Sequence, residues 1–177
     1  MKVSLIAAIT ADGFIARTKT DRSFDWTSPE DKQFYVESIK RAGAVVMGSQ
    51  TFQTFTRYPK GLKFVIYTRT PETFVNPKPE VITTWATNAS PQQVVDQLVQ
   101  KKYSEVAICG GSSIYSMWMK SGLVTDLYLT VEPVLFGSGI PLFAETFFRR
   151  LLLKEHRLLN ADTHVLHYEV LPESTVA

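Results

Sequence analysis

Short runs of apolar residues recur along the whole chain, and most are continuous rather than alternating with polar residues. Continuous runs rich in β-branched residues are typical of strands buried on both faces of a mainly parallel sheet. We therefore predict such a sheet at the centre of the protein. The runs are Val3–Ile9, Ala44–Met47, Lys63–Tyr67, Val81–Ile82, Val106–Cys109 and Leu127–Val131.

Helical patterns lie between these runs. Ser28-Pro29 and Ser90-Pro91 each offer a serine N-cap followed by a proline at the first helical position. A third helix is predicted after Gly110-Gly111, with Gly122 as its C-terminal cap. Strands that alternate with helices predict an α/β fold with helices on both faces of the sheet.

The C-terminal part departs from this alternation. Residues 151–158 and 165–170 are apolar-rich and flank the turn-like segment Asn160–Asp162. This pattern predicts an antiparallel hairpin that closes one edge of the sheet.

Composition narrows the possible classes further. The 177 residues are 45% hydrophobic and fit one domain over residues 1–177. The net charge of +2 argues against a strongly basic nucleic-acid binder. A single cysteine, Cys109, rules out a disulfide framework, and three scattered histidines predict no metal site. The uncharged run Val106–Met119 is well short of the ~20 apolar residues of a membrane span, so we expect a cytoplasmic protein with no membrane partner.

Two strand-to-helix junctions contain small, flexible residues. One is Gly48–Thr51, and the other runs through Gly110, Gly111, Ser112 and Ser113. Helix N-termini bind phosphate, and ligands of open α/β sheets lie beyond the carboxyl ends of the strands. The two turns together would suit a dinucleotide pyrophosphate. The alternative is that the glycines only make tight turns, since neither junction matches GxGxxG or a P-loop.

Arg69 follows the predicted strand Lys63–Tyr67 at the same edge. A cation at this place would pair with a 2′-phosphate and favour NADP over NAD. The alternative is a solvated surface arginine.

Asp31 is the most informative carboxylate. It lies three residues after Ser28, which approximates a capping box. It also shares a helix face with Phe34 and Tyr35, and an acid beside aromatic rings has a raised pKa that suits proton donation. The spacing allows both interpretations. For Trp26, just before this helix, core packing is the simpler interpretation.

Five motifs in one order resemble the dihydrofolate reductase superfamily over nearly the whole chain. They are Ser4–Ala8, Trp26-x-x-Pro29-x-Asp31, Met47-Gly48-x-x-Thr51, Gly110-Gly111-x-x-x-Tyr115 and Leu127–Thr130. Each motif is weak alone, but each lies on the element that the periodicity predicts. The resemblance implies a dihydrofolate reductase-like fold and an NADPH-dependent hydride-transfer enzyme.

The resemblance also implies residue roles. Asp31 matches the acid that holds the substrate ring and assists its protonation, and Thr130 matches the residue that hydrogen-bonds this acid. Trp26 matches a tryptophan beside the contact of nicotinamide and substrate, and Tyr35 is expected to bind substrate with Asp31 and Thr130. The peptide between the two glycines is expected to be cis. The cofactor-binding residues implied are Ala8, Ile15, Ala16, Gly48, Ser49, Thr51, Thr68, Arg69, Gly110, Gly111, Ser112, Ser113, Ile114 and Tyr115.

Departures from the superfamily pattern identify a branch. Leu62 stands where dihydrofolate reductases place an arginine for the glutamate tail of folate, and Ser49 replaces a basic residue near the cofactor. Losing a bidentate contact to a carboxylate weakens binding. The segments Asp12–Ala16 and Pro133–Phe143 are more similar to the reductase domain of the riboflavin-biosynthesis deaminase–reductase and its stand-alone relatives.

The sequence therefore predicts an NADPH-dependent reductase of a small heterocycle, resembling 5-amino-6-(5-phosphoribosylamino)uracil reductase. The alternatives are dihydrofolate reductase proper and a cofactor-binding relative with another substrate or without catalysis. Relatives in the riboflavin branch form dimers, so a homodimer is expected. Its candidate contact surface is Leu142–Phe148, whose other interpretation is a short helix that covers the sheet.

Overall fold

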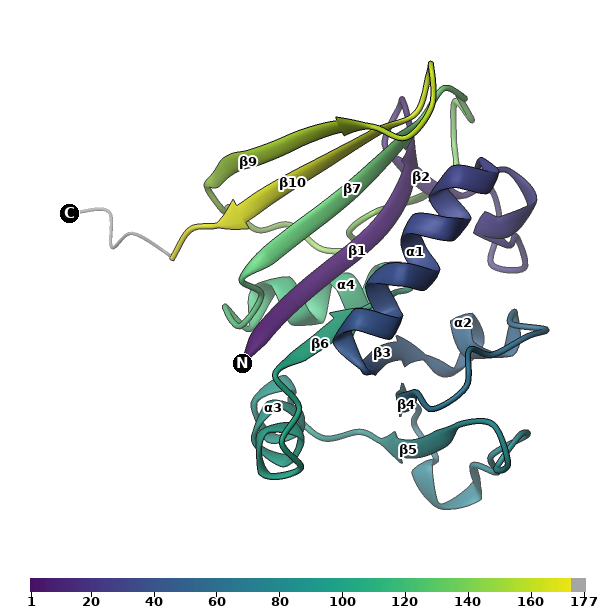
Figure 1. Cartoon of the computed structure of the whole chain (residues 1–177), viewed down its shortest axis with the longest axis vertical. Helices are drawn as coiled ribbons and strands as arrows, with labels where there is room; N and C mark the ends of the chain where they lie inside the picture. The colour runs from purple at the N-terminus through teal and green to yellow at the C-terminus, as the bar shows by residue number, and fades with distance from the viewer. Residues whose placement is uncertain (173–177) are drawn as a thin grey trace.

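A computed structural model describes residues 1–172 of the chain (Figure 1). Within these residues one sheet has eight strands in the order β5-β4-β3-β6-β1-β7-β10-β9. Its strands are β1 (Lys2–Thr10), β3 (Ala44–Gly48), β4 (Lys63–Tyr67), β5 (Thr83–Thr87), β6 (Glu105–Ile108), β7 (Asp126–Glu132), β9 (Leu151–Leu158) and β10 (His164–Val170).

Strands β5, β4, β3, β6, β1 and β7 pair in parallel, and β10 runs antiparallel to both β7 and β9. The predicted parallel centre and C-terminal hairpin are therefore confirmed. The hairpin forms one edge of the sheet, and all eight residues of its outer strand β9 are exposed.

Helices cover both faces of the sheet, as predicted. The helices are α1 (Pro29–Ala42), α2 (Ser49–Gln53), α3 (Pro91–Gln100) and α4 (Ser112–Lys120). Figure 1 shows α1 in front of the sheet and α4 behind it. Two apolar cores result because neighbouring residues of a strand face opposite sides: Val45 and Met47 pack with α1 and α2, whereas Val46 packs with α3 and α4.

Two local predictions are wrong. Val81 and Ile82 do not form a strand, because both of their N–H groups bond to the carbonyl of Lys78 in a turn, and the strand β5 begins only at Thr83. The helix considered for Leu142–Phe148 does not form either: the segment bends at residues 142, 144 and 145, and the hydroxyl of Ser116 on α4 accepts hydrogen bonds from the N–H groups of residues 144 and 145.

The Leu142–Phe148 segment packs mainly onto its own chain. Phe143 and Phe147 contact each other edge to face, with ring centroids 4.7 Å apart, and lie against the core under α4. Phe148 alone among its aromatic residues is strongly exposed, at 71%. The homodimer remains a prediction, which the native molar mass in solution tests.

Two segments that carry the riboflavin-branch motifs lie side by side. Strand β2 (Phe14–Ala16) pairs antiparallel with β8 (Ile140–Pro141). The Asp12 carboxylate accepts hydrogen bonds from the backbone N–H groups of Phe136 and Gly137. A Cβ atom on Gly139 would lie 2.4 Å from the carbonyl oxygen of Ala16, so this approach requires glycine.

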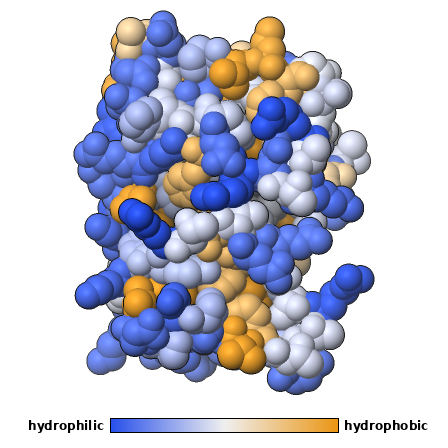
Figure 2. Space-filling view, turned by 90° about the vertical axis from the view of Figure 1, so that its right-hand side faces the viewer, coloured by the Kyte–Doolittle hydropathy of each residue, from blue (hydrophilic) through white to orange (hydrophobic). Residues whose placement is uncertain are grey.

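On the face that Figure 2 presents, hydrophobic residues form separate patches among hydrophilic ones. Among the described residues, no helix has the length and hydrophobicity that crossing a membrane requires.

Candidate active site

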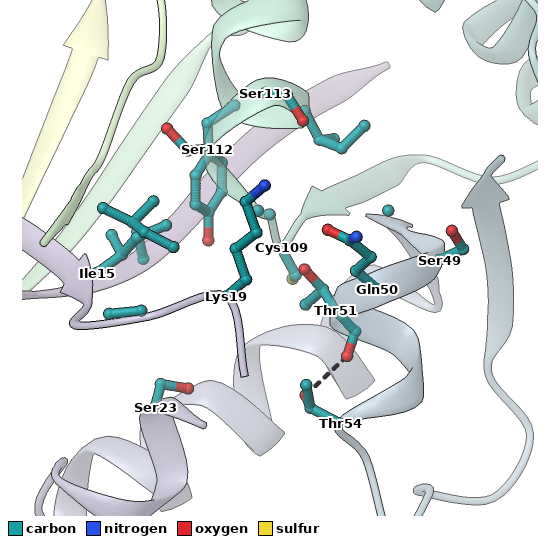
Figure 3. Close-up of a pocket in the computed structure, with 18 of the residues that line it drawn as sticks. Ile15, Lys19, Ser23, Ser49, Gln50, Thr51, Thr54, Cys109, Ser112 and Ser113 are labelled. Carbon is teal, nitrogen blue, oxygen red and sulfur yellow. Dashed lines mark hydrogen bonds between the residues drawn. The ribbon is translucent and has the colours of Figure 1, made fainter. Parts of the chain in front are cut away.

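The two glycine turns meet because β3 and β6 are neighbours in the sheet. Gly48 ends β3 and Gly110 follows β6, and the N–H of Gly48 donates to the carbonyl of Gly110 at 2.8 Å. The peptide between Gly110 and Gly111 is cis, as the resemblance implied. Figure 3 shows Ser112 and Ser113 on one side of the space between the turns, and Gln50 and Thr51 on the other.

A cavity of about 1200 Å³ opens beyond the carboxyl ends of these strands. All fourteen residues predicted to bind the cofactor line it, together with Asp31 and Tyr35. The cavity extends from Arg69 at the end of β4, past both glycine turns, to Asp31 on α1. The structure therefore gathers in one space the phosphate-binding candidates and the candidate acid, which lie far apart in the sequence.

The glycine turns leave no room for side chains. A Cβ atom on Gly48 would lie 3.3 Å from Cγ1 of Ile114, and one on Gly111 would lie 3.3 Å from Oγ1 of Thr51. Gly110 has a φ of +93°, and its Cβ would lie 3.0 Å from the ring of Tyr115. Glycine is therefore needed for the close packing of these turns against Ile114, Tyr115 and Thr51, and the packed turns line the cavity with their backbone.

The N-terminus of α4 adds polar groups to the same turn. The Ser112 hydroxyl oxygen is buried and has no hydrogen-bond partner among residues 1–172. The Tyr115 hydroxyl donates to the carbonyl of Ile6 at 2.7 Å, which fixes this helix against β1. Unpaired buried hydroxyls cost free energy, so the Ser112 side chain is suited to a phosphate oxygen.

Replacing Gly110 with alanine tests the turn. The added methyl group would crowd Tyr115 and strain a left-handed backbone, which costs about 1–3 kcal/mol. We expect at least a ~10-fold weaker affinity for NADPH, measured by fluorescence titration. Gly122→Ala is the matched control: Gly122 also has a positive φ, of +74°, but no atom lies within 4 Å of its added Cβ. Equal losses in both variants would contradict the assignment of the turn to the cofactor.

Asp31 does not complete a capping box. Its N–H donates to the Ser28 hydroxyl at 3.2 Å, as expected for an N-cap. The reciprocal bond is not made, because the Ser28 N–H donates to Glu132 at 2.8 Å. The Asp31 carboxyl lines the cavity instead, which supports its interpretation as a site acid.

The surroundings of Asp31 favour its protonated form. Burial, the largest influence, raises the pKa of the Asp31 carboxyl, and the nearby Glu132 carboxylate raises it further. A hydrogen bond from Thr130 lowers this pKa, but the net result is a raised pKa. Thr130 is itself 1% exposed on β7 and does not line the cavity. Its hydroxyl contacts Asp31 rather than the cavity, and its role in the reaction stays a prediction.

Tyr35 and Cys109 form the floor of the cavity beside Asp31. Burial raises the pKa of Tyr35 well above its ordinary value, so its hydroxyl keeps its proton. This buried hydroxyl lies against the Cys109 thiol, with which it interacts. Burial also raises the pKa of the Cys109 thiol to about 12, so Cys109 is not a thiolate nucleophile at neutral pH.

Trp26 is not brought together with the other predicted site residues. It does not line the cavity, and its ring packs edge to face against Phe136 with centroids 5.2 Å apart. Phe24, two residues earlier, supplies an aromatic ring to the cavity instead. Its ring contacts those of Tyr35 and Phe55, which gives this end of the cavity an aromatic wall.

Several lining residues were not predicted from the sequence. Among them are Phe24, Phe55, Asn88 and Cys109. Cys109 and Asn88 directly follow the ends of the parallel strands β6 and β5, a position that would have identified them. Nothing in the local sequence distinguishes the other two, because they lie in loops or short helices whose course the periodicity does not determine.

Comparison with known protein families gives one match over most of the chain. Residues 1–166 match the model of the RibD C-terminal domain. The chain belongs to this family. The expectation drawn from the sequence motifs, a dihydrofolate reductase-like fold of the riboflavin branch, is therefore confirmed.

Relatives of this RibD C-terminal domain agree with the assignment. Protein YwjB of Bacillus subtilis is 28% identical over 152 residues, which cover 81% of this chain and 83% of YwjB. The diaminohydroxyphosphoribosylaminopyrimidine deaminase/5-amino-6-(5-phosphoribosylamino)uracil reductase of Thermotoga maritima superposes with a TM-score of 0.75 at 16% identity, over 96% of this chain and 56% of that longer one. The dihydrofolate reductase of Enterococcus faecalis complexed with NADP(H) superposes with a TM-score of 0.70 at 17% identity, over 96% of each chain.

Proposed function

We propose that this RibD-type domain is an NADPH-dependent oxidoreductase that transfers a hydride to a substrate carrying a pyrimidine- or pterin-like heterocycle, like the 5-amino-6-(5-phosphoribosylamino)uracil reductases that it resembles. One observation carries the proposal: a buried acid, Asp31, lines the same cavity as two adjoining glycine turns suited to phosphate. The family match and the similarity to the Thermotoga reductase support the reaction type. The similarity to a dihydrofolate reductase that holds NADP(H) supports the cofactor.

The residues present fit NADPH. The backbone of Gly48–Thr51 and of Gly110–Ser113 would hold the pyrophosphate, because both turns line the cavity and the Ser112 hydroxyl needs a partner. Thr68 and Arg69 would hold the 2′-phosphate at the end of β4. When bound, NADPH supplies the hydride that reduces the acceptor. The contribution of the protein is to position the two reactants and to exclude water.

The acceptor would lie beside Asp31, between the aromatic wall and the floor of the cavity. Asp31 would hold the amino face of the heterocycle and relay a proton from its carboxyl oxygen to an acceptor that takes up a proton together with the hydride. The Tyr35 hydroxyl would donate a second hydrogen bond to the acceptor. Phe24 and Phe55 offer apolar surfaces that suit a flat ring.

Leu62 favours the pyrimidine over folate. Its side chain is 4% exposed and packs in the core with Phe64 and Ile82 rather than lining the cavity. Among the described residues the only cations that line the cavity are Lys19 and Arg69. The protein therefore lacks the arginine that the folate enzymes place at this position to bind the dicarboxylate tail of their acceptor.

Removing the Tyr35 hydroxyl is expected to weaken acceptor binding. In Tyr35→Phe, one neutral hydrogen bond worth about 0.5–1.5 kcal/mol is lost, so the KM of the acceptor should rise roughly 3- to 10-fold. The affinity for NADPH should not change. Tyr58→Phe is the control, because Tyr58 stacks on Phe55 but does not line the cavity. An unchanged KM in Tyr35→Phe would show that this hydroxyl does not face the acceptor.

A further inference from the structure

Glu132 is a buried carboxylate that the proposed reaction does not yet use. It lies on β7 two residues after Thr130, so both side chains are on the same face of the strand, and it is 2% exposed. Its Oε1 accepts hydrogen bonds from the N–H and the hydroxyl of Ser28, both at 2.8 Å. Its Oε2 accepts a hydrogen bond from the Thr163 hydroxyl at 3.1 Å. A buried carboxylate with three donors is held firmly in one position.

One hydroxyl connects Glu132 to the candidate acid. Ser28 is the N-cap of α1: its hydroxyl donates to Glu132 and accepts from the N–H of Asp31 at 3.2 Å. Glu132 also occupies the Ser28 N–H, which would otherwise be available to the Asp31 carboxyl. The carboxyl of Asp31 is therefore not used in capping the helix, and it lines the cavity.

We propose that Glu132 is a positioning residue for the reaction: by fixing Ser28 it directs the Asp31 carboxyl into the cavity, and it places a second buried carboxylate beside that carboxyl. The inference rests on the proposed function of Asp31. It assigns to the same site a second carboxylate that touches neither acceptor nor cofactor.

The charge effect follows from the groups around Asp31. Glu132 is the one other carboxyl among the principal influences on Asp31, and its negative charge disfavours a second negative charge close by. The hydroxyl of Thr130 and the charge of Lys32 act in the opposite direction. The polar and titratable groups that face Asp31 are Lys32 and Tyr35 on α1, Thr27 before it, Thr130 and Glu132 on β7, and Tyr115 on α4.

Glu132→Gln separates the charge from the hydrogen bonds. The amide oxygen can still accept from Ser28, and the amide nitrogen can donate to Thr163, so the geometry is preserved. The Asp31 carboxyl, followed by its ¹³C resonance in a pH titration, should ionise at lower pH in this variant than in the wild type. If the reductase activity is present, the fall of kcat with rising pH should begin at lower pH in this variant, with an unchanged Kd for NADPH.

Glu105→Gln is the matched control. Glu105 is also a buried carboxylate, hydrogen-bonded to Ser4 at 2.8 Å and paired with Arg41, but it is the first residue of β6, at the end of the parallel strands opposite the cavity. This variant should leave the titration of Asp31 unchanged. An Asp31 titration that is the same in Glu132→Gln and the wild type, or that shifts equally in the control, overturns the proposal.

Ser28→Ala provides a second test if Glu132→Gln does not fold. It removes the hydroxyl that donates to Glu132 and accepts from the Asp31 N–H, so the titration of the Asp31 carboxyl should differ from that of the wild type. An Asp31 titration that is the same in Ser28→Ala and the wild type overturns the proposal. Both titrations are read without any acceptor, so they distinguish failure of this inference from failure of the proposed function.

Discussion

Replacing Asp31 with asparagine is expected to lower turnover of the acceptor by about two to four orders of magnitude, which is the range typical for loss of a positioned acid. The Kd for NADPH is expected to change less than about two-fold. The reason lies in the cavity. Asp31 lines its acceptor end, whereas both glycine turns and Arg69 are contributed by other elements. Steady-state kinetics and fluorescence titration of NADPH measure the two quantities separately.

The same variant should be more stable than the wild type at neutral pH. Burial raises the pKa of Asp31 in the folded state. The contribution of Asp31 to the free energy of unfolding is therefore complete below the unfolded pKa, and it is lost as the pH rises through the folded pKa. The amide has no charge to bury, so thermal unfolding at pH 8 should occur at a higher temperature. Asp25→Asn, at an exposed position outside the cavity, is the control for both measurements. Equal losses of turnover and NADPH affinity, or no loss of either, would contradict the role given to Asp31.

Replacing Arg69 with alanine is expected to weaken NADPH binding about 10-fold, which corresponds to one charge-assisted contact of about 1.5 kcal/mol, and to leave NADH binding unchanged. Arg69 is exposed at the end of the cavity beside Thr68 and Asn88. A 2′-phosphate is the only group by which the two cofactors differ. Because the site is exposed, the difference between NADPH and NADH should decrease at high salt.

Lys78→Ala is the control for Arg69. It removes one positive charge from an exposed residue that does not line the cavity, so any effect of net charge alone would be the same in both variants. Fluorescence titrations with NADPH and NADH compare them. A loss of affinity for both cofactors in Arg69→Ala would contradict the 2′-phosphate assignment.

The fold was predictable from sequence where burial is strong. Continuous apolar runs at Ala44–Met47 and Lys63–Tyr67 lie within or coincide with strands, because those strands are buried on both faces. The edge strand Thr83–Thr87 was missed, since an edge strand needs few apolar residues and Val81 and Ile82 drew the prediction toward the preceding turn. Hydrophobicity alone likewise did not show that Leu142–Phe148 packs without helical structure.

The site was predictable where one element determines it. The glycine turns and Asp31 each belong to a short motif on one strand or helix, and the structure places them as expected. Spacing cannot show which side chains another element brings into contact. Trp26 therefore packs against Phe136 instead of lining the cavity, and the contact of Glu132 with Ser28 joins residues more than one hundred positions apart.

The most direct test of the proposed reductase offers two acceptors in parallel and follows NADPH oxidation by absorbance. One acceptor is the deaminated phosphoribosylamino-pyrimidine, and the other is dihydrofolate. We predict that the pyrimidine is reduced, that dihydrofolate is not, and that Asp31→Asn abolishes the reaction. Turnover of dihydrofolate alone, or no NADPH oxidation with either acceptor, would contradict the account.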